Sequence, residues 1–280
     1  MAGSPVAGFP MGDAAAKYGR SFSIGLRGAF EYRLNFAFSI MSAIAPVVIQ
    51  TALWTRLYAP GSGDTLFGFT FPQMIAYTVV ANLVSRLVRT GFEYELNADI
   101  KTGGLDRYLV KPIGYFGFRL CVFLGSKSVP TGLNLVLLAG AAWALHAVLG
   151  VPVSVMAACA FVASILVAFV LNFLIFWCVG MAGFWLTEIG FLFEAARIVI
   201  ITASGGIFPL SVFGPRGQAL LGMLPFRFTI QFPTELLCGR IPAGRIPTEL
   251  GLALLWIAAL AGLSRVLWNA GIRRFAAVGS

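Results

Sequence analysis

A long uncharged stretch limits most strongly how this chain can fold. Between Lys127 and Glu188 the sequence contains no Asp, Glu, Lys or Arg. A membrane-crossing helix needs about 20 mostly apolar residues, so the stretch accommodates two crossings separated by a turn at 146–152. The second of these, Val153–Trp185, is longer than a bilayer requires, which predicts a tilted or projecting helix.

The composition extends this conclusion to the whole chain. Of its 280 residues 59% are hydrophobic and 11% are charged, whereas a soluble domain carries roughly 25% charged residues. So few charges cannot cover a surface in water. The composition therefore excludes a soluble enzyme, a coiled coil, a disulfide scaffold and a disordered tail, and it indicates an all-α integral membrane protein.

Scanning the chain for apolar runs of spanning length predicts six transmembrane helices. The fifth is short and is interrupted by Gly and Pro, and the region after it is too rich in these residues for an uninterrupted helix. We expect that region, residues 205–247, to form a re-entrant hairpin or a surface loop. The predicted segments are Leu34–Tyr58, Phe69–Val88, Leu120–Leu149, Val153–Trp185, Ile198–Phe213 and Leu250–Trp268.

The basic residues predict the orientation of these segments. The chain has 20 Lys and Arg against 11 Asp and Glu, a net charge of +9. With six spans, roughly three quarters of the basic residues fall on the side that carries both chain ends, and basic residues favour the cytoplasmic side. We therefore expect both ends in the cytoplasm. This accounts for the positive charge without nucleic acid.

We divide the chain into two parts. Residues 1–33 form a cytosolic leader whose basic and apolar residues favour a helix lying on the membrane surface. Residues 34–280 form the six-span domain. This domain includes a polar loop over residues 89–113 and the extracytoplasmic hairpin over residues 205–247.

Several kinds of chemistry find no support in the sequence. There is no G-x-x-x-x-G-K-[ST] phosphate loop, so we expect no nucleotide hydrolysis by this chain. The four cysteines form no CxxC pair, and His146 is the single histidine, so we expect no metal site and no enzyme activity. If the protein moves a substrate uphill, its energy source must lie on another polypeptide.

The polar loop is the most informative segment. It predicts a helix with acidic residues in its first turns, which ends at Gly103-Gly104. Leu96, Ile100, Leu105 and Leu109 give the loop an apolar edge rimmed by charges. Such an edge is typical of a docking element for a partner, although a surface helix lying back on the bilayer is an equal alternative.

Two motifs resemble the permeases of ABC-2 type transporters, most of all the drug- and viologen-exporter-like branch. One motif is the polar loop, and the other is a Pro-rich segment that resembles the hairpin before the last span. In the loop the matching positions are Glu93, Ile100, Gly103, Leu105, Asp106, Leu109, Lys111 and Pro112. In the hairpin the corresponding segments are Ser204–Leu210 and Leu224-Pro225-Phe226, with Pro233 and Gly239.

The resemblance implies a fold, a partner and two sets of functional residues. It implies an ABC-2 (type V) exporter fold, powered by separate ATPase subunits that hold ATP and Mg, with no cofactor bound by this chain. It also implies a second, non-identical permease subunit and contact with membrane lipid. The coupling helix that docks on the ATPase would use Glu93, Leu96, Ile100, Gly103, Gly104, Leu105, Asp106, Leu109, Lys111 and Pro112. The hairpin or gate would use Gly205, Gly206, Pro209, Pro225, Phe226 and Arg227.

The function implied is export of a hydrophobic or amphipathic substrate across a bacterial inner membrane. Two alternatives stay open: a permease for a polysaccharide or glycolipid, and a membrane scaffold that recruits an ATPase without transport. Two smaller alternatives concern side chains. Glu194 and Arg197 can share a helix face, as a second cytosolic contact to the ATPase or as a gate pair, or can merely mark a solvated helix end. The aromatic residues Phe169, Phe173, Phe176 and Trp177 can line a substrate path or pack between helices.

Overall fold

The computed structural model describes residues 17–24, 33–59, 64–105, 114–150, 155–186 and 189–278. Within these ranges the chain is helical and contains no strand apart from one isolated bridge between Leu66 and Phe69. The all-α prediction is therefore confirmed for the part of the chain that the structure describes.

Among the described residues, six helices are longer than 13 residues. The longer helices are α2 (Arg33–Leu57), α3 (Phe71–Val88), α6 (Tyr115–Leu149), α7 (Val155–Gly180), α8 (Gly190–Ala203) and α11 (Ile246–Val278). The polar loop contains α4 (Phe92–Lys101), and η1 (Met181–Phe184) continues α7. Between α8 and α11 lie η2 (Leu210–Phe213), α9 (Gly214–Met223), η3 (Pro225–Thr229), α10 (Gln231–Leu237) and η4 (Ala243–Arg245).

Two helical segments are long and apolar enough to cross a membrane, and a third qualifies if a bent helix is one span. The first two are Met156–Phe184 and Ala243–Phe275. The third is α6, whose two parts meet at a bend of 43° near Pro130. Proline removes a backbone donor and clashes with the preceding turn, which accounts for a bend there. These segments make the chain a multi-pass membrane protein, whereas the six-span layout stays a prediction.

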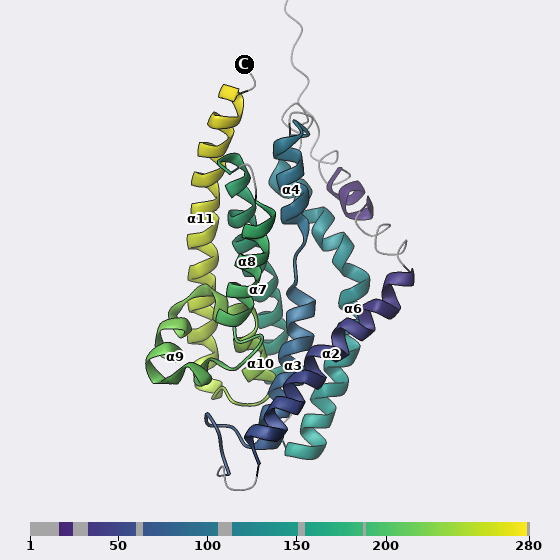
Figure 1. Ribbon diagram of the computed structural model, residues 1–280, viewed down its shortest axis with the longest axis vertical. Helices are drawn as coiled ribbons and strands as arrows, with labels where there is room; N and C mark the ends of the chain where they lie inside the picture. Colours follow the sequence, from purple (N-terminus) through teal and green to yellow (C-terminus); the bar gives the residue numbers. More distant parts are fainter. Residues whose placement is uncertain are drawn as a thin grey trace, which may run out of the picture.

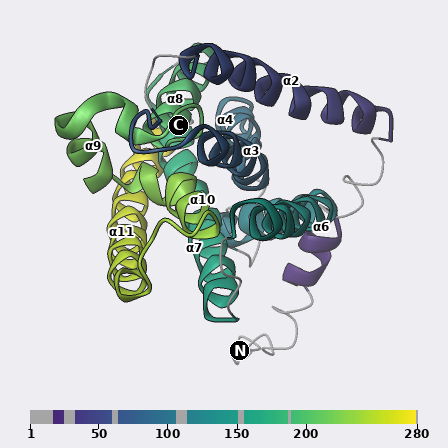
Figure 2. The ribbon, with the colours of Figure 1, turned by 90° about the horizontal axis from the view of Figure 1, so that it is seen from below.

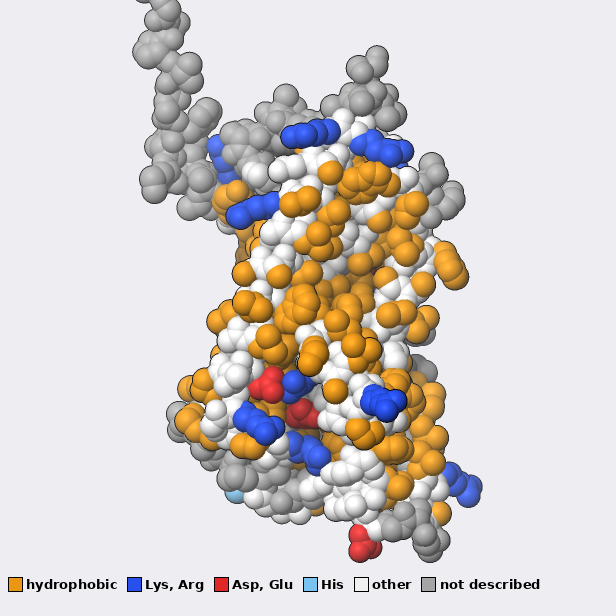
Figure 3. Space-filling view, turned by 90° about the vertical axis from the view of Figure 1, so that its left-hand side faces the viewer, with side chains coloured by type: hydrophobic (Ala, Val, Ile, Leu, Met, Phe, Trp, Pro, Cys, Tyr) orange, Lys and Arg blue, Asp and Glu red, His pale blue; other side chains and the backbone are white. Residues whose placement is uncertain are grey.

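The helices run broadly along the long axis of the molecule (Figure 1). α4 and the C-terminal end of α11 lie at one end, and α9 and α10 lie toward the other. Viewed along this axis, α3 lies between α2 and α6, with which it packs, and α11 packs along α7 (Figure 2). Figure 3 shows a belt of hydrophobic side chains between two ends that carry charged residues. This belt is the surface expected to face lipid.

Polar side chains also join the helices to one another. Asn82 on α3 donates to the Gln50 side chain on α2 at 2.8 Å, and Asn172 on α7 donates to the Val88 carbonyl at 2.6 Å. Such bonds are favourable where no water is present to satisfy the same groups. The two asparagines therefore hold helices together.

The predicted fifth segment, Ile198–Phe213, is wrong at both ends. α8 begins at Gly190 and ends at Ala203, after which Gly205 adopts a φ of 79°. The prediction began too late because it treated Glu194 and Arg197 as a break in the membrane helix. In the structure both side chains contact α4 instead, which allows the helix to continue through them.

Candidate functional site

Helix α4 converts the polar loop into an amphipathic helix. Glu93 and Glu95 lie in its first turn, where the positive end of the helix dipole favours acidic side chains. The helix ends before Gly103, whose φ of 71° is a left-handed conformation that suits glycine. The buried side chains recur at helical spacing, and they are Phe92, Glu93, Leu96 and Ile100.

Three of the four apolar residues expected to form an exposed docking edge are buried, and the fourth, Leu109, lies outside the described residues. Leu96 and Leu105 are 0% exposed and Ile100 is 6% exposed, because they pack into a core with η1 and the end of α7. These residues anchor α4 to its own chain. The surface that α4 offers to a partner consists of other side chains: Tyr94, Glu95, Ala98, Lys101 and Thr102.

Two glycines allow α4 to lie this close to the end of α7. A Cβ added at Gly180 would lie 2.8 Å from Leu96 Cδ2, and one added at Gly183 would lie 2.7 Å from Asn97 Oδ1. Both distances are shorter than van der Waals contact. Sequence reasoning missed these glycines, although their spacing of three residues places them one turn apart.

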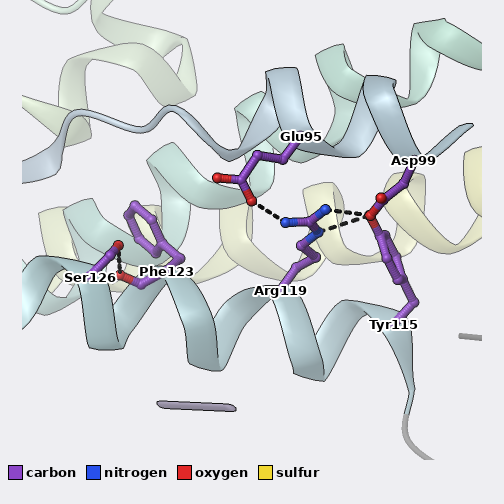
Figure 4. A network of polar contacts seen from close by, with 6 residues as sticks. All are labelled: Glu95, Asp99, Tyr115, Arg119, Phe123 and Ser126. Carbon is purple, nitrogen blue, oxygen red and sulfur yellow. Dashed lines mark hydrogen bonds and ion pairs between the residues drawn. The ribbon is translucent and has the colours of Figure 1, made fainter. Parts of the chain in front are cut away.

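Arg119 on α6 holds one side of α4. Its guanidinium forms ion pairs with Glu95 and Asp99, one turn apart on α4, and its Nε donates to the Tyr115 hydroxyl at 2.8 Å (Figure 4). The Tyr115 hydroxyl in turn donates to Asp99 at 2.6 Å. The Arg119 side chain is 7% exposed. A buried cation shared between two carboxylates fixes α4 against α6.

Arg197 on α8 holds the other side of α4. Its Nη2 donates to Glu93 Oε1 at 2.5 Å, and Glu93 is 0% exposed. The same guanidinium lies 5.5 Å from the Phe176 ring centre and 4.0 Å from Glu194, whose carboxylate accepts a hydrogen bond from Tyr94. The Glu194 carboxylate raises the pKa of the Tyr94 hydroxyl. The pairing of Glu194 with Arg197 therefore belongs to a contact between α4 and α8.

Aromatic rings fill the space beneath α4. Phe92 stacks on Phe173 with ring centres 4.4 Å apart, and Trp177 stacks on Trp268 of α11 at 5.7 Å. Phe173, Phe176 and Trp177 are buried within the chain. Of the two interpretations of this aromatic series, the structure favours packing between helices for these three rings.

The structure describes only part of the predicted docking set. Asp106, Leu109, Lys111 and Pro112 lie outside the described residues. Gly103 and Gly104 are partly exposed, and a Cβ at Gly104 would lie 2.9 Å from Asp99 Oδ1. The described docking residues thus gather at the end of the molecule where α4 lies (Figure 1).

The predicted hairpin consists of short helices connected by turns. Gly205 begins it, and its carbonyl accepts a hydrogen bond from the Tyr77 hydroxyl of α3 at 2.7 Å. The backbone N–H of Gln231 donates to the Ser204 carbonyl at 2.9 Å and so joins the two ends of the segment. A Cβ at Gly206 would lie 2.7 Å from Ile201 and 2.9 Å from Ile230, which explains why glycine is needed here.

Arg227 in this segment forms an ion pair within the chain. Its Nη2 lies 2.9 Å from Glu249 Oε1 in the first turn of α11, and both side chains are about one-fifth exposed, at 19% and 18%. The resemblance assigned Arg227 to the hairpin or gate. In the structure the pair joins η3 to α11. Of the other residues assigned to the gate, Pro209 and Pro225 are buried and Phe226 is partly buried.

Glu235 is a partly buried carboxylate in the hairpin. Its Oε1 accepts a hydrogen bond from Gln231 Nε2 at 2.7 Å. Burial raises the pKa of Glu235 above its usual value, opposed by the Gln231 hydrogen bond and by the charges of Arg227 and Arg240. Arg240 itself lies over the Phe69 ring at 3.6 Å and donates to the Gly68 carbonyl at 3.0 Å.

The structure keeps the two predicted sites apart. The docking residues lie with α4 at one end, whereas the hairpin lies toward the other (Figure 1). η3 contacts both α7 and α8, and these two helices reach α4, so packed helices connect the sites. Among the described residues, no three His, Cys, Asp or Glu side chains lie close enough together to hold a metal ion.

Comparison with known proteins gives a match over most of the chain. A family model described as "ABC-2 family transporter protein" matches residues 34–279, from the second residue of α2 to just beyond the end of α11. None of the curated proteins compared with the chain matches it.

Proposed function

The chain belongs to the ABC-2 family of transporter proteins, and from this membership we propose that it is the permease subunit of an ATP-driven exporter. Family membership makes it the membrane component of an ABC transporter, which works with an ATPase. The proposed substrate is hydrophobic or amphipathic and moves outward across the inner membrane of a bacterium. A second permease subunit, a non-identical relative, completes the pathway.

The observation that carries this proposal is the double attachment of α4. Arg119 joins α4 to α6, and Arg197 joins it to α8. The buried face of α4 also packs on α7 and η1. A force applied to the outer face of α4 would therefore reach three long helices together, which is what a coupling helix requires.

We infer that this outer face is where the ATPase docks. Tyr94, Glu95, Ala98, Lys101 and Thr102 are exposed there and are not needed for the internal core. With α4 in the cytoplasm, the C-terminal end of α11 is cytoplasmic too, and the hairpin faces outward. Basic residues near the C-terminus, Arg273 and Arg274, agree with this orientation.

ATP hydrolysis by the complex tests the proposal. The tagged chain is purified with its nucleotide-binding subunit, and hydrolysis is measured with and without added amphipathic compounds. Ala98→Arg on α4 should reduce association about tenfold or more, because a long charged side chain prevents close contact. Ala219→Arg on α9, also exposed, is the matched control and should associate normally.

Three results would overturn parts of this proposal. Equal association of both variants would contradict docking on α4. A complex whose rate of ATP hydrolysis is unchanged by every added amphipathic compound would favour the scaffold alternative. Stimulation by glycolipids or oligosaccharides alone would favour the polysaccharide or glycolipid exporter.

A further inference from the structure

A cavity lined partly by basic and polar side chains and partly by apolar ones lies where α3, α7 and α8 meet. Its volume is about 300 Å³, within the size range of ligand sites. One part of the lining is basic and polar, with Arg86, Arg89, Thr90 and Arg197. The other part is apolar, with Ile198 and Ile201 of α8 among its residues.

The basic part has an excess of positive charge. The described residues that line the cavity include three arginines and no carboxylate. Outside the lining, Arg197 pairs with Glu93 at 2.5 Å and lies 4.0 Å from the exposed Glu194. Arg89 is exposed and repels Arg86, three residues before it. An anion in the cavity would reduce this repulsion.

Two donors in this region have no hydrogen-bond partner among the described residues. Thr90 Oγ1 is buried and unpaired, and the residue is only 6% exposed. Arg197 Nε likewise makes no hydrogen bond and lies 4.0 Å from Glu194 Oε2, whereas Nη1 of the same side chain donates to the Thr90 carbonyl at 3.4 Å. Buried polar groups are rarely left unpaired. An oxygen-rich anionic group would supply acceptors to both.

The apolar part leads from these donors toward the surface that faces lipid. Ile198 lines the cavity and is 63% exposed, so the cavity continues onto the outer face of α8. The larger cavity between α6, α7 and α10, of about 430 Å³, has no charged residue in its described lining. A charged end and an apolar end therefore occur together at the smaller cavity.

We propose that this cavity binds an anionic amphipath, with its phosphate, sulfate or carboxylate head at Arg89, Thr90 and Arg197 and its apolar tail along Ile198 and Ile201. The ligand is either a resident anionic phospholipid or an anionic molecule of cargo. Binding requires neither the ATPase nor transport, so the inference goes beyond the proposed function and can fail separately from it.

The test is direct binding to the purified full chain in a neutral detergent. Native mass spectrometry measures the affinities of phosphatidylglycerol and phosphatidylcholine, which differ in head charge. Dodecyl phosphate and dodecyltrimethylammonium then compete with the bound phospholipid. The wild type should prefer phosphatidylglycerol about tenfold, and dodecyl phosphate should displace it whereas the cationic compound should not.

Two variants test whether the anionic head binds at the basic part of the cavity. Arg89→Gln combined with Thr90→Val should reduce the preference for phosphatidylglycerol to about threefold or less. Arg89 is suited to this test because its exposed side chain makes no hydrogen bond with the described residues. Arg216→Gln on α9 removes the same charge from an exposed position outside the cavity. It should retain the full preference.

Analysis of the lipids extracted from freshly purified protein distinguishes a resident phospholipid from an anionic cargo molecule. Enrichment of phosphatidylglycerol in the wild type, lost in the double variant, identifies a resident phospholipid. Absence of enrichment together with tight binding of dodecyl phosphate identifies an anionic cargo molecule. Equal affinity of the wild type for the two phospholipids would overturn the proposal. So would a loss of the phosphatidylglycerol preference in Arg216→Gln as large as the loss in the double variant.

Discussion

Arg197 on α8 pairs with Glu93 on α4 at 2.5 Å, although the two residues are 104 positions apart in the sequence. Glu93 is completely buried, and the Arg197 side chain is 18% exposed. This pair fastens the charged helix at one end of the molecule to a helix that continues to the hairpin. It is the contact through which a displacement of α4 would reach α8.

Removing the charge of Glu93 should destabilise the protein strongly. Glu93→Gln leaves the Arg197 guanidinium without its buried counter-charge, and breaking such a pair costs about 3 kcal/mol. Glu95→Gln removes a carboxylate whose side chain is 61% exposed, and it should cost less than about 1 kcal/mol. Thermal unfolding in detergent measures both. Equal losses would show that the buried pair has no special role.

The packing of α11 on η1 can be tested with two glycines of the same helix. A Cβ at Gly271 would overlap the Phe184 ring and lie 2.7 Å from its Cε2, whereas one at Gly262 has nothing within 4 Å. Gly271→Ala should therefore cost about 1–3 kcal/mol through overpacking. Gly262→Ala should be neutral or stabilising, because alanine favours helix. A stable Gly271→Ala variant would contradict the close contact of these elements.

The start of the hairpin depends on the backbone of Gly205. This residue combines a φ of 79° with a Cβ position 2.7 Å from the Tyr77 hydroxyl. Gly150 at the end of α6 is also left-handed, with a φ of 63°, but has open space around it. Gly150→Ala should lose about 1–2 kcal/mol from left-handed strain alone, and Gly205→Ala should lose clearly more. Melting temperatures of the two variants give the comparison, and a smaller loss at Gly205 would refute the packing argument.

Stability should depend on pH through Glu235. Its folded pKa is raised above the usual value of 4.5 because burial disfavours the carboxylate. As the pH rises from 4.5 through the folded pKa, the folded state keeps a proton that the unfolded state has released, so stability is lost. Glu235→Gln cannot ionise and keeps an acceptor for Gln231.

This variant should therefore melt higher than the wild type at pH 8 and close to it at pH 4. The exposed Asp64→Asn variant controls for the removal of one negative charge. A Glu235→Gln variant that is less stable than the wild type at pH 8 would show that the carboxylate is charged and stabilising in the folded protein.

The sequence predicted most of the long helices because each contains an apolar run about long enough to cross a bilayer. It also predicted α4, whose acidic first turn and terminal glycines are local signals. It failed on which face of α4 is exposed. The spacing of Leu96 and Ile100 shows that they share a face, but only the glycines of a distant segment, Gly180 and Gly183, show what covers that face.

The charged residues were misinterpreted for a similar reason. Hydropathy treats Arg197 as a break in a membrane helix, because the sequence does not show that Glu93 neutralises it. Likewise, the sequence did not show that Arg227 pairs with Glu249, which lies 22 residues later on another helix. Pairing across the fold depends on the packing of whole helices, which the local pattern does not encode.

Crosslinking in intact cells tests the central claim most directly. A photoreactive amino acid is placed at Ala98 on α4 or, as the matched position, at Ala219 on α9, both of which are exposed. The account predicts that illumination joins the ATPase subunit to the chain labelled at position 98 and not to the chain labelled at position 219. A crosslink to the ATPase from position 219, with none from position 98, would contradict both the docking surface and the orientation in the membrane.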